Sequence, residues 1–105
     1  MGQIEPQKLE KNAEKASKLL KSMSHPGRLM VLCHLMTGEC PVSALNQAAP
    51  LSQSALSQHL AALRKADLVE TRRESQVIYY RLKSQAVAEI LASLYRIYCN
   101  PNNEE

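Results

Sequence analysis

The 105-residue chain has no apolar run near the roughly 18 residues that a membrane-spanning helix needs. The segment from Met1 to Glu14 is polar, so it shows no secretory signal either. These two absences lead us to expect a cytoplasmic protein with no membrane partner. The sequence also lacks a nucleophile–base set and a cofactor-binding loop, which makes an enzyme the weakest of the functions considered.

Metal-ligating residues are few and do not form a set. The histidines His25, His34 and His59 are spread over two expected helices. A metal site needs about four donors that converge on one point. We therefore expect no metal and no other cofactor.

The composition is that of an ordinary small domain. Hydrophobic residues make up 45% of the chain and charged residues 22%, which is usual for a globular protein, and the length fits one domain over residues 1–105. A domain this small buries proportionally little surface, so a homodimer is a reasonable expectation. The net charge is +3, and the most basic segment, 52–83, is a weak indication of a polyanionic partner.

Apolar periodicity predicts a mainly α-helical chain with a small β-hairpin. Ser24, Ser52 and Ser84 are the expected N-caps of three helices, Cys40-Pro41 is expected to break the chain, and the hairpin turn is expected near Ser75. The order α-α-α-α-β-β-α is that of a winged helix-turn-helix. The expected helices are about 7–22, 25–37, 42–48, 52–66 and 84–99; the helix-turn-helix covers about 42–66 and the wing about 68–82.

The segment from 51 to 69 has the division of residues that a DNA-reading helix needs. Its apolar residues share one side, while short polar side chains stay on the other, where they are able to enter the major groove. The hairpin that follows carries basic residues where a wing meets phosphates or the minor groove. The plainer alternative is a solvated polar helix beside a charged hairpin. The candidate DNA-binding residues are Ser52, Gln53, Ser54, Ser57, Gln58, His59, Arg64, Arg72, Arg73 and Gln76.

Three stretches give the chain its family resemblance: KLLKSMSHPGRLMVLCHL (18–35), LSQSALSQHLAALRKADLV (51–69) and VIYYRL (77–82). They resemble the ArsR/SmtB dimeric winged-helix repressors, and the S-x-H-L element at 57–60 is among the more specific features. The resemblance implies a homodimer built from the first and last helices, about 7–22 and 84–99. It also implies an inverted-repeat DNA operator whose halves lie about 34 Å apart. The wing turn departs from the family, which often has Gly there, because this chain has Ser75.

The metal sites common in this family are not matched. Pro41 and Ser43 occupy the usual thiolate positions of one site, with Cys40 one place off, and the helix expected at 84–98 contains neither Asp nor His for the other. His59 matches a family helix residue that we interpret as a packing or anchoring group rather than a base contact. His34 is expected to be a half-buried neighbour of the core.

The cysteines allow two interpretations. From the residues alone, Cys33 is a small core hydrophobe and Cys99 an incidental thiol, and a structural disulfide is not expected in the cytosol. By resemblance, Cys33 in V-L-C-H-L and Cys99 in L-Y-R-I-Y-C match the sensing pair of the sulfide- and persulfide-responsive subgroup, the BigR-like and HlyU-like regulators. The resemblance implies that persulfides bridge the pair and weaken DNA binding. Cys40 is expected to be exposed and dispensable.

These observations favour a transcriptional repressor that is released from DNA when reactive sulfur species oxidise Cys33 and Cys99. A general peroxide or thiol-redox regulator that uses the same pair is the nearest alternative. A constitutive antirepressor without an effector, a protein-interaction module and, less favoured, a metal-responsive repressor remain open.

Overall fold

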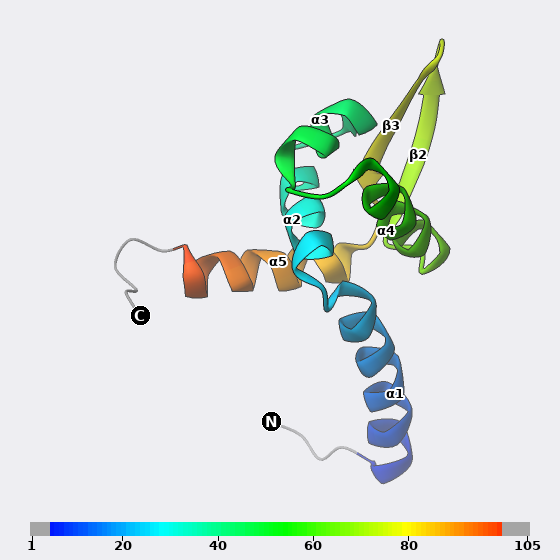
Figure 1. Cartoon of the computed structure of the whole chain (residues 1–105). Coiled ribbons are helices and arrows are strands. Elements are labelled where there is room, and N and C mark those ends of the chain that lie inside the picture. Colours follow the sequence, from blue (N-terminus) through cyan, green and yellow to red (C-terminus); the bar gives the residue numbers. More distant parts are fainter. Residues whose placement is uncertain (1–4, 100–105) are drawn as a thin grey trace.

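The computed structural model describes residues 5–99 as five helices and three short strands (Figure 1). The helices are α1 (Pro6–Met23), α2 (Pro26–Leu35), α3 (Val42–Ala48), α4 (Gln53–Lys65) and α5 (Gln85–Tyr98). The strands are β1 (Cys40–Pro41), β2 (Val69–Glu74) and β3 (Val77–Leu82). The predicted fold class, mainly helical with a small antiparallel hairpin, is confirmed.

The sheet has one strand more than the sequence predicted. β1 pairs with β3, placing Cys40 opposite Tyr80 and Pro41 opposite Tyr79, so the strand order is β1-β3-β2. The Cys40-Pro41 segment does break the chain between two helices, as expected, but its pairing as a strand was not predicted. A two-stranded hairpin leaves the outer edge of β3 with unpaired backbone groups, and the extended segment before α3 satisfies part of that edge.

The burial of Cys40 corrects a second expectation. Its side chain is only 8% exposed and belongs to the hydrophobic core, whereas the sequence predicted an exposed thiol. Because side chains alternate along a strand, the pairing of β1 with β3 turns Cys40 inward beside the half-buried Tyr80.

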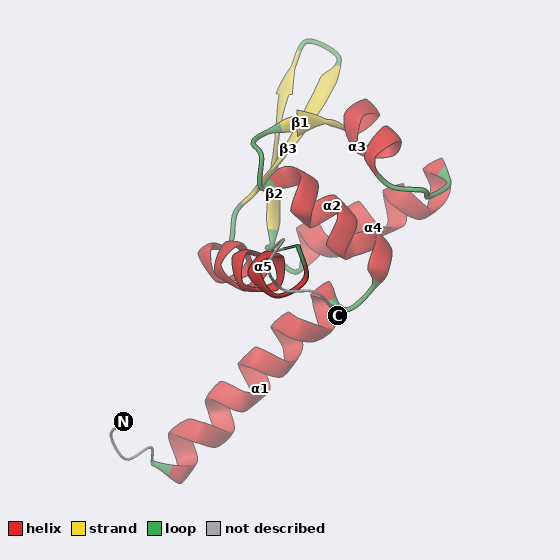
Figure 2. Cartoon of the chain, turned by 90° about the vertical axis from the view of Figure 1, so that its left-hand side faces the viewer, coloured by secondary structure: helices red, strands yellow, loops and turns green. Residues whose placement is uncertain are grey.

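The core is aliphatic and lies between α2, α3, α4, the sheet and the first half of α5. Helix α2 lies at the centre of this arrangement, in contact with α3, α4 and β3 (Figure 2). Among the residues that the structure describes, no polar or charged residue is buried. The largest fully buried side chains are Leu32, Leu45, Leu56, Leu63, Leu91, Val31, Val69 and Val87.

Two of the three predicted N-caps are confirmed. The hydroxyl of Ser52 accepts a hydrogen bond from the Ala55 N–H at 3.1 Å, and that of Ser84 accepts one from the Val87 N–H at 3.2 Å. The third prediction was wrong, because His25 rather than Ser24 caps α2. Nδ1 of His25 accepts from the Gly27 N–H at 2.9 Å, and Pro26 takes the first helical position.

Helices α1 and α5 extend away from this core in different directions (Figure 1). Met23, at the end of α1 next to the core, is buried, but Leu9 and Leu20 of the same helix are 52% and 53% exposed. The far end of α5 likewise exposes Tyr95 and Tyr98. A single chain therefore leaves apolar surface on both helices uncovered. None of the helices within residues 5–99 is long and apolar enough to cross a membrane.

Candidate nucleic-acid interface and thiol cavity

Helix α4 divides its side chains between the core and solvent. Leu56, Leu60 and Leu63 are buried. Its exposed polar residues include Gln53, Ser54, Ser57, Gln58 and Arg64, which we call the α4 polar face. A groove of about 640 Å³ runs between α4 and β3, lined from α4 by Ser57, Ala61 and Arg64, among others, and from β3 by Ile78 and Tyr80. Ser52 lies at the start of the helix, where its hydroxyl is used as the cap.

His59, the remaining candidate on α4, points inward. Its Nδ1 accepts a hydrogen bond from Nε of Arg28 at 3.1 Å, and its ring lies 4.3 Å from that of His25. Nη1 of Arg28 also donates to the backbone oxygen of Ser22 at 3.0 Å. This network ties α4 to the junction between α1 and α2, as the interpretation of His59 as an anchoring residue predicted.

Burial lowers the pKa of His59, and the neighbouring His25 and Arg28 lower it further. The folded chain therefore takes up a proton at His59 less readily than an unfolded chain, in which an ordinary histidine is protonated below about pH 6.5. Stability should fall as the pH drops below that value, since the unfolded state then binds more protons. His59→Asn should flatten this dependence, because its Oδ1 keeps an acceptor for Arg28 without titrating. Urea midpoints at about pH 7.5 and 5.5 test this, and an equal acid loss in both proteins would contradict it.

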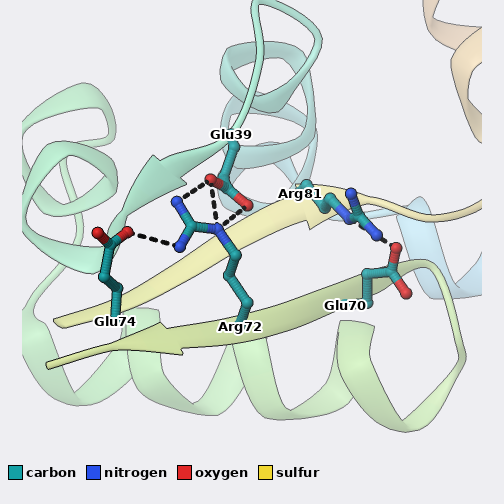
Figure 3. Close-up of polar contacts among 5 residues, drawn as sticks. All are labelled: Glu39, Glu70, Arg72, Glu74 and Arg81. Atoms are coloured by element: carbon teal, nitrogen blue, oxygen red, sulfur yellow. Dashed lines mark hydrogen bonds and ion pairs between the residues drawn. The ribbon is translucent and has the colours of Figure 1, made fainter. Parts of the chain in front are cut away.

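The predicted DNA-binding residues of the wing, Arg72, Arg73 and Gln76, have different surroundings. Arg72 is held by ion pairs to two carboxylates: its Nη2 lies 2.7 Å from Oε1 of Glu39, and its Nη1 lies 2.7 Å from Oε2 of Glu74 (Figure 3). Its guanidinium also lies 4.5 Å from the centroid of the Tyr79 ring. Arg73 and Gln76 are exposed. Ser75, in the turn, has a φ of 61°, a left-handed conformation that explains the preference for Gly there.

Cys33 and Cys99 line the same cavity, although they are 66 positions apart in the sequence. Cys33 lies on α2 and Cys99 is the C-cap of α5, and both are exposed. The cavity, which we call the thiol cavity, measures about 860 Å³ and has no charged side chain in its lining. Its lining residues are Leu29, Cys33, Met36, Thr37, Leu94, Tyr95, Tyr98 and Cys99.

Partial burial raises the pKa of the Cys33 thiol, and the nearby Cys99 raises it further. Cys33 is therefore held in its thiol form more strongly than an ordinary cysteine. Two thiols that open onto one cavity are suitably placed for a joint reaction. Cys40 is separate from this pair, in the sheet, where burial and Glu39 raise the pKa of its thiol.

The sequence reasoning missed two residues that organise the site. Arg28 anchors His59 from 31 positions away, and Glu39 holds Arg72 from 33 positions away. Nothing local in the sequence marks either pair, because both partners are ordinary charged or polar residues on separate elements. Within residues 5–99, no group of three His, Cys, Asp or Glu side chains is arranged to hold a metal ion.

Comparison with known proteins assigns the chain to a family. The family described as "Bacterial regulatory protein, arsR family" matches residues 25–71, from α2 into β2. The transcriptional activator HlyU of Vibrio cholerae is 48% identical over 96 residues, which cover 91% of this chain and 89% of HlyU. The chain belongs to the ArsR family.

Further ArsR-family proteins agree with this assignment along the whole fold. The biofilm growth-associated repressor of Agrobacterium fabrum is 42% identical over 101 residues, which cover 96% of this chain and 86% of that protein. The crystal structure of the transcriptional repressor BigR from Xylella fastidiosa superposes with a TM-score of 0.83 at 42% identity, covering 91% of this chain and 98% of BigR. The chain is thus a winged-helix transcriptional regulator that binds DNA, and not an enzyme.

Proposed function

We propose that this ArsR-family regulator is a homodimeric repressor that binds an inverted-repeat operator and releases it when reactive sulfur species bridge Cys33 and Cys99. The observation that carries the proposal is the thiol cavity, which opens both cysteines to solvent between α2 and α5. Cys40 is buried and lines no part of this cavity, so the pair of thiols available for reaction is the one that the sequence singled out.

The proposed DNA contacts are the α4 polar face, with Arg73 and Gln76 of the wing. The glutamine amide is able to form two hydrogen bonds with the major-groove edge of adenine, and serine bonds to bases or phosphates, so the exposed side of α4 suits the major groove. The side chains of Arg64 and Lys65 make no hydrogen bond or ion pair within the described part of the chain, which leaves their charges available for phosphates.

Dimerisation is supported by the apolar surface that α1 and α5 leave uncovered. Leu9 and Leu20 lie on one side of α1, and Tyr95 and Tyr98 at the exposed end of α5, each more than half exposed. Side chains of this size gain about 1.5–3 kcal/mol each when fully buried, which favours covering them with a second copy. A symmetric dimer would present two α4 helices to the two halves of an operator.

The proposed reaction balances with an organic persulfide, RSSH, as the oxidant. One cysteine thiolate attacks the outer sulfur of RSSH, which transfers that sulfur to the cysteine and releases RSH. The second cysteine attacks Sγ of the first cysteine, which breaks the bond from Sγ to the transferred sulfur and expels hydrogen sulfide, leaving a disulfide. Each further sulfur inserted into the bridge consumes one more RSSH and releases one more RSH.

A bridge between Cys33 and Cys99 would join two helices with different neighbours. Helix α2 contacts α3 and α4, which form the helix-turn-helix, whereas α5 extends toward the proposed dimer partner. Fixing α2 to the end of α5 would therefore bias the spacing of the two α4 helices in a dimer, and so the affinity for the operator.

The test combines intact mass with DNA binding on one sample. The probe is a labelled duplex of roughly 30 base pairs, which the protein selects from a random pool and which is long enough for two half-sites one helical turn apart. An organic persulfide should link Cys33 to Cys99 and lower affinity. The same loss with hydrogen peroxide would broaden the function to general redox sensing. Unchanged affinity after complete bridging would overturn the switch, and failure to select any duplex would overturn operator binding.

A further inference from the structure

The two consecutive arginines of the wing lie on opposite faces of the hairpin. Arg72 pairs with Tyr79 across the strands and Arg73 pairs with Ile78, and directly paired residues share a face. Ile78 and Tyr80 line the groove against α4, so Arg73 lies on the α4 side of the hairpin. Arg72 lies on the other side, with Tyr79 and Glu39 (Figure 3).

Arg72 is surrounded by negative charge. Its Nε donates to both carboxylate oxygens of Glu39, at 2.8 and 2.9 Å, and its Nη1 donates to Glu74 at 2.7 Å. The three side chains together carry one net negative charge. The hydrogen bond with Arg72 also lowers the pKa of Glu39, so both partners stay ionised at neutral pH. A phosphate that approached Arg72 would have to displace these carboxylates.

Arg73 has no such competitor. Its side chain is exposed, and within residues 5–99 it forms no hydrogen bond or ion pair. Its charge is therefore free to neutralise a phosphate on the side of the wing that faces the groove beside α4.

The position of Glu39 explains what its pairing with Arg72 accomplishes. Glu39 immediately precedes β1, a strand of only two residues, so few backbone hydrogen bonds fasten the segment after α2 to the hairpin. The ion pair between Glu39 and Arg72 adds a side-chain link between this segment and β2, which lies beyond the intervening strand β3. It thereby restrains the tilt of the hairpin relative to α3 and α4.

We propose that Glu39 and Arg72 form a clamp that positions the wing, and that Arg73, not Arg72, supplies the phosphate contact from this pair. Arg72 is thus a positioning residue, and the sequence interpretation of both arginines as DNA contacts applies to Arg73 alone. This inference rests on the proposed use of α4 and the wing for operator binding.

Salt dependence separates the two roles. The full-length protein and the selected duplex are titrated at several KCl concentrations. For each phosphate that a protein neutralises, the slope of log affinity against log salt steepens by about 0.9. Arg73→Gln should therefore make the slope shallower by about 0.9 for each protomer on the DNA. Arg72→Gln should leave the slope unchanged and lower affinity about threefold to tenfold at every salt concentration, since it loosens the wing without removing a phosphate contact.

Arg81→Gln is the matched control. Arg81 is exposed and pairs with Glu70 at 2.6 Å on the same face of the hairpin, so its replacement makes the same change in net charge without removing a hydrogen bond or ion pair of the clamp. It should change neither the slope nor the affinity. Glu39→Gln should also lower affinity, and the double variant should lose no more than Arg72→Gln alone, because Arg72→Gln already removes the pairing with Glu39 together with that to Glu74.

The outcomes are distinct for each proposal. A shallower slope with Arg72→Gln would overturn the clamp, as would additive losses in the double variant or a loss no larger than that of Arg81→Gln. An unchanged slope with Arg73→Gln would overturn its role as the phosphate contact. A wild-type protein that selects and binds no duplex at low salt would instead overturn the proposed operator binding itself.

Discussion

The double substitution Leu9→Glu, Leu20→Glu should convert the protein to a monomer and lower its affinity for the selected duplex by at least about 100-fold. The two side chains lie on one side of α1 and are 52% and 53% exposed in a single chain. A charge on each would have to be desolvated to form the proposed dimer interface, which is strongly unfavourable. A monomer then binds each half-site alone and loses the gain of about 10²- to 10⁴-fold that linked sites provide.

Sedimentation or light scattering measures the mass, and fluorescence anisotropy measures the affinity. A second variant, Gln7→Glu with Lys18→Gln, makes the same change in net charge on the opposite side of α1. It should remain a dimer with nearly unchanged affinity. Circular dichroism should show both variants folded, because Leu9 and Leu20 lie outside the core. A dimeric double-glutamate variant would refute the assignment of this face.

Cys33→Ser and Cys99→Ser should each abolish the response to persulfide while leaving the affinity of the reduced protein within about twofold of wild type. Both side chains are exposed, so an oxygen in place of sulfur costs little folding free energy. In the wild type, bridging should lower affinity by at least about tenfold, within the usual range of coupling between two sites. Anisotropy titrations before and after persulfide treatment, with intact mass on the same samples, measure both quantities.

Cys40→Ala is the control for this pair. It removes the third thiol from its buried place in β1, and alanine avoids leaving a buried hydroxyl without a partner. The variant should respond to persulfide as the wild type does. A lost response in Cys40→Ala, or a persistent response in either serine variant, would show that the bridge uses a different pair.

Local signals made most of the fold predictable from the sequence. Helix α4 is the clearest case, because a serine cap, an apolar stripe and a terminal basic pair all lie within one segment, and the structure begins and ends it as expected. Strand β1 was not predictable in this way. Two residues carry no periodicity, and their conformation depends on an open edge of β3 that lies about 40 positions later in the sequence.

In the candidate site, too, features set by local sequence were predictable and those that depend on distant residues were not. Periodicity alone indicated which residues of α4 face solvent, whereas the different surroundings of Arg72 and Arg73 depend on Glu39, a partner on another element. The shared cavity of Cys33 and Cys99 likewise depends on where α2 and the end of α5 lie relative to one another. Family resemblance suggested that pair, but no spacing rule connects residues so far apart.

The burial of Cys40 determines how many thiols the oxidised protein leaves on its surface. Of the three cysteines in the chain, two are exposed, and both open onto one cavity. The internal bridge proposed between Cys33 and Cys99 would use both exposed thiols. The oxidised chain would then present no accessible thiol with which a second molecule or glutathione could form a mixed disulfide. The burial of the third cysteine would thus confine the proposed oxidation to one chain and prevent crosslinked aggregates.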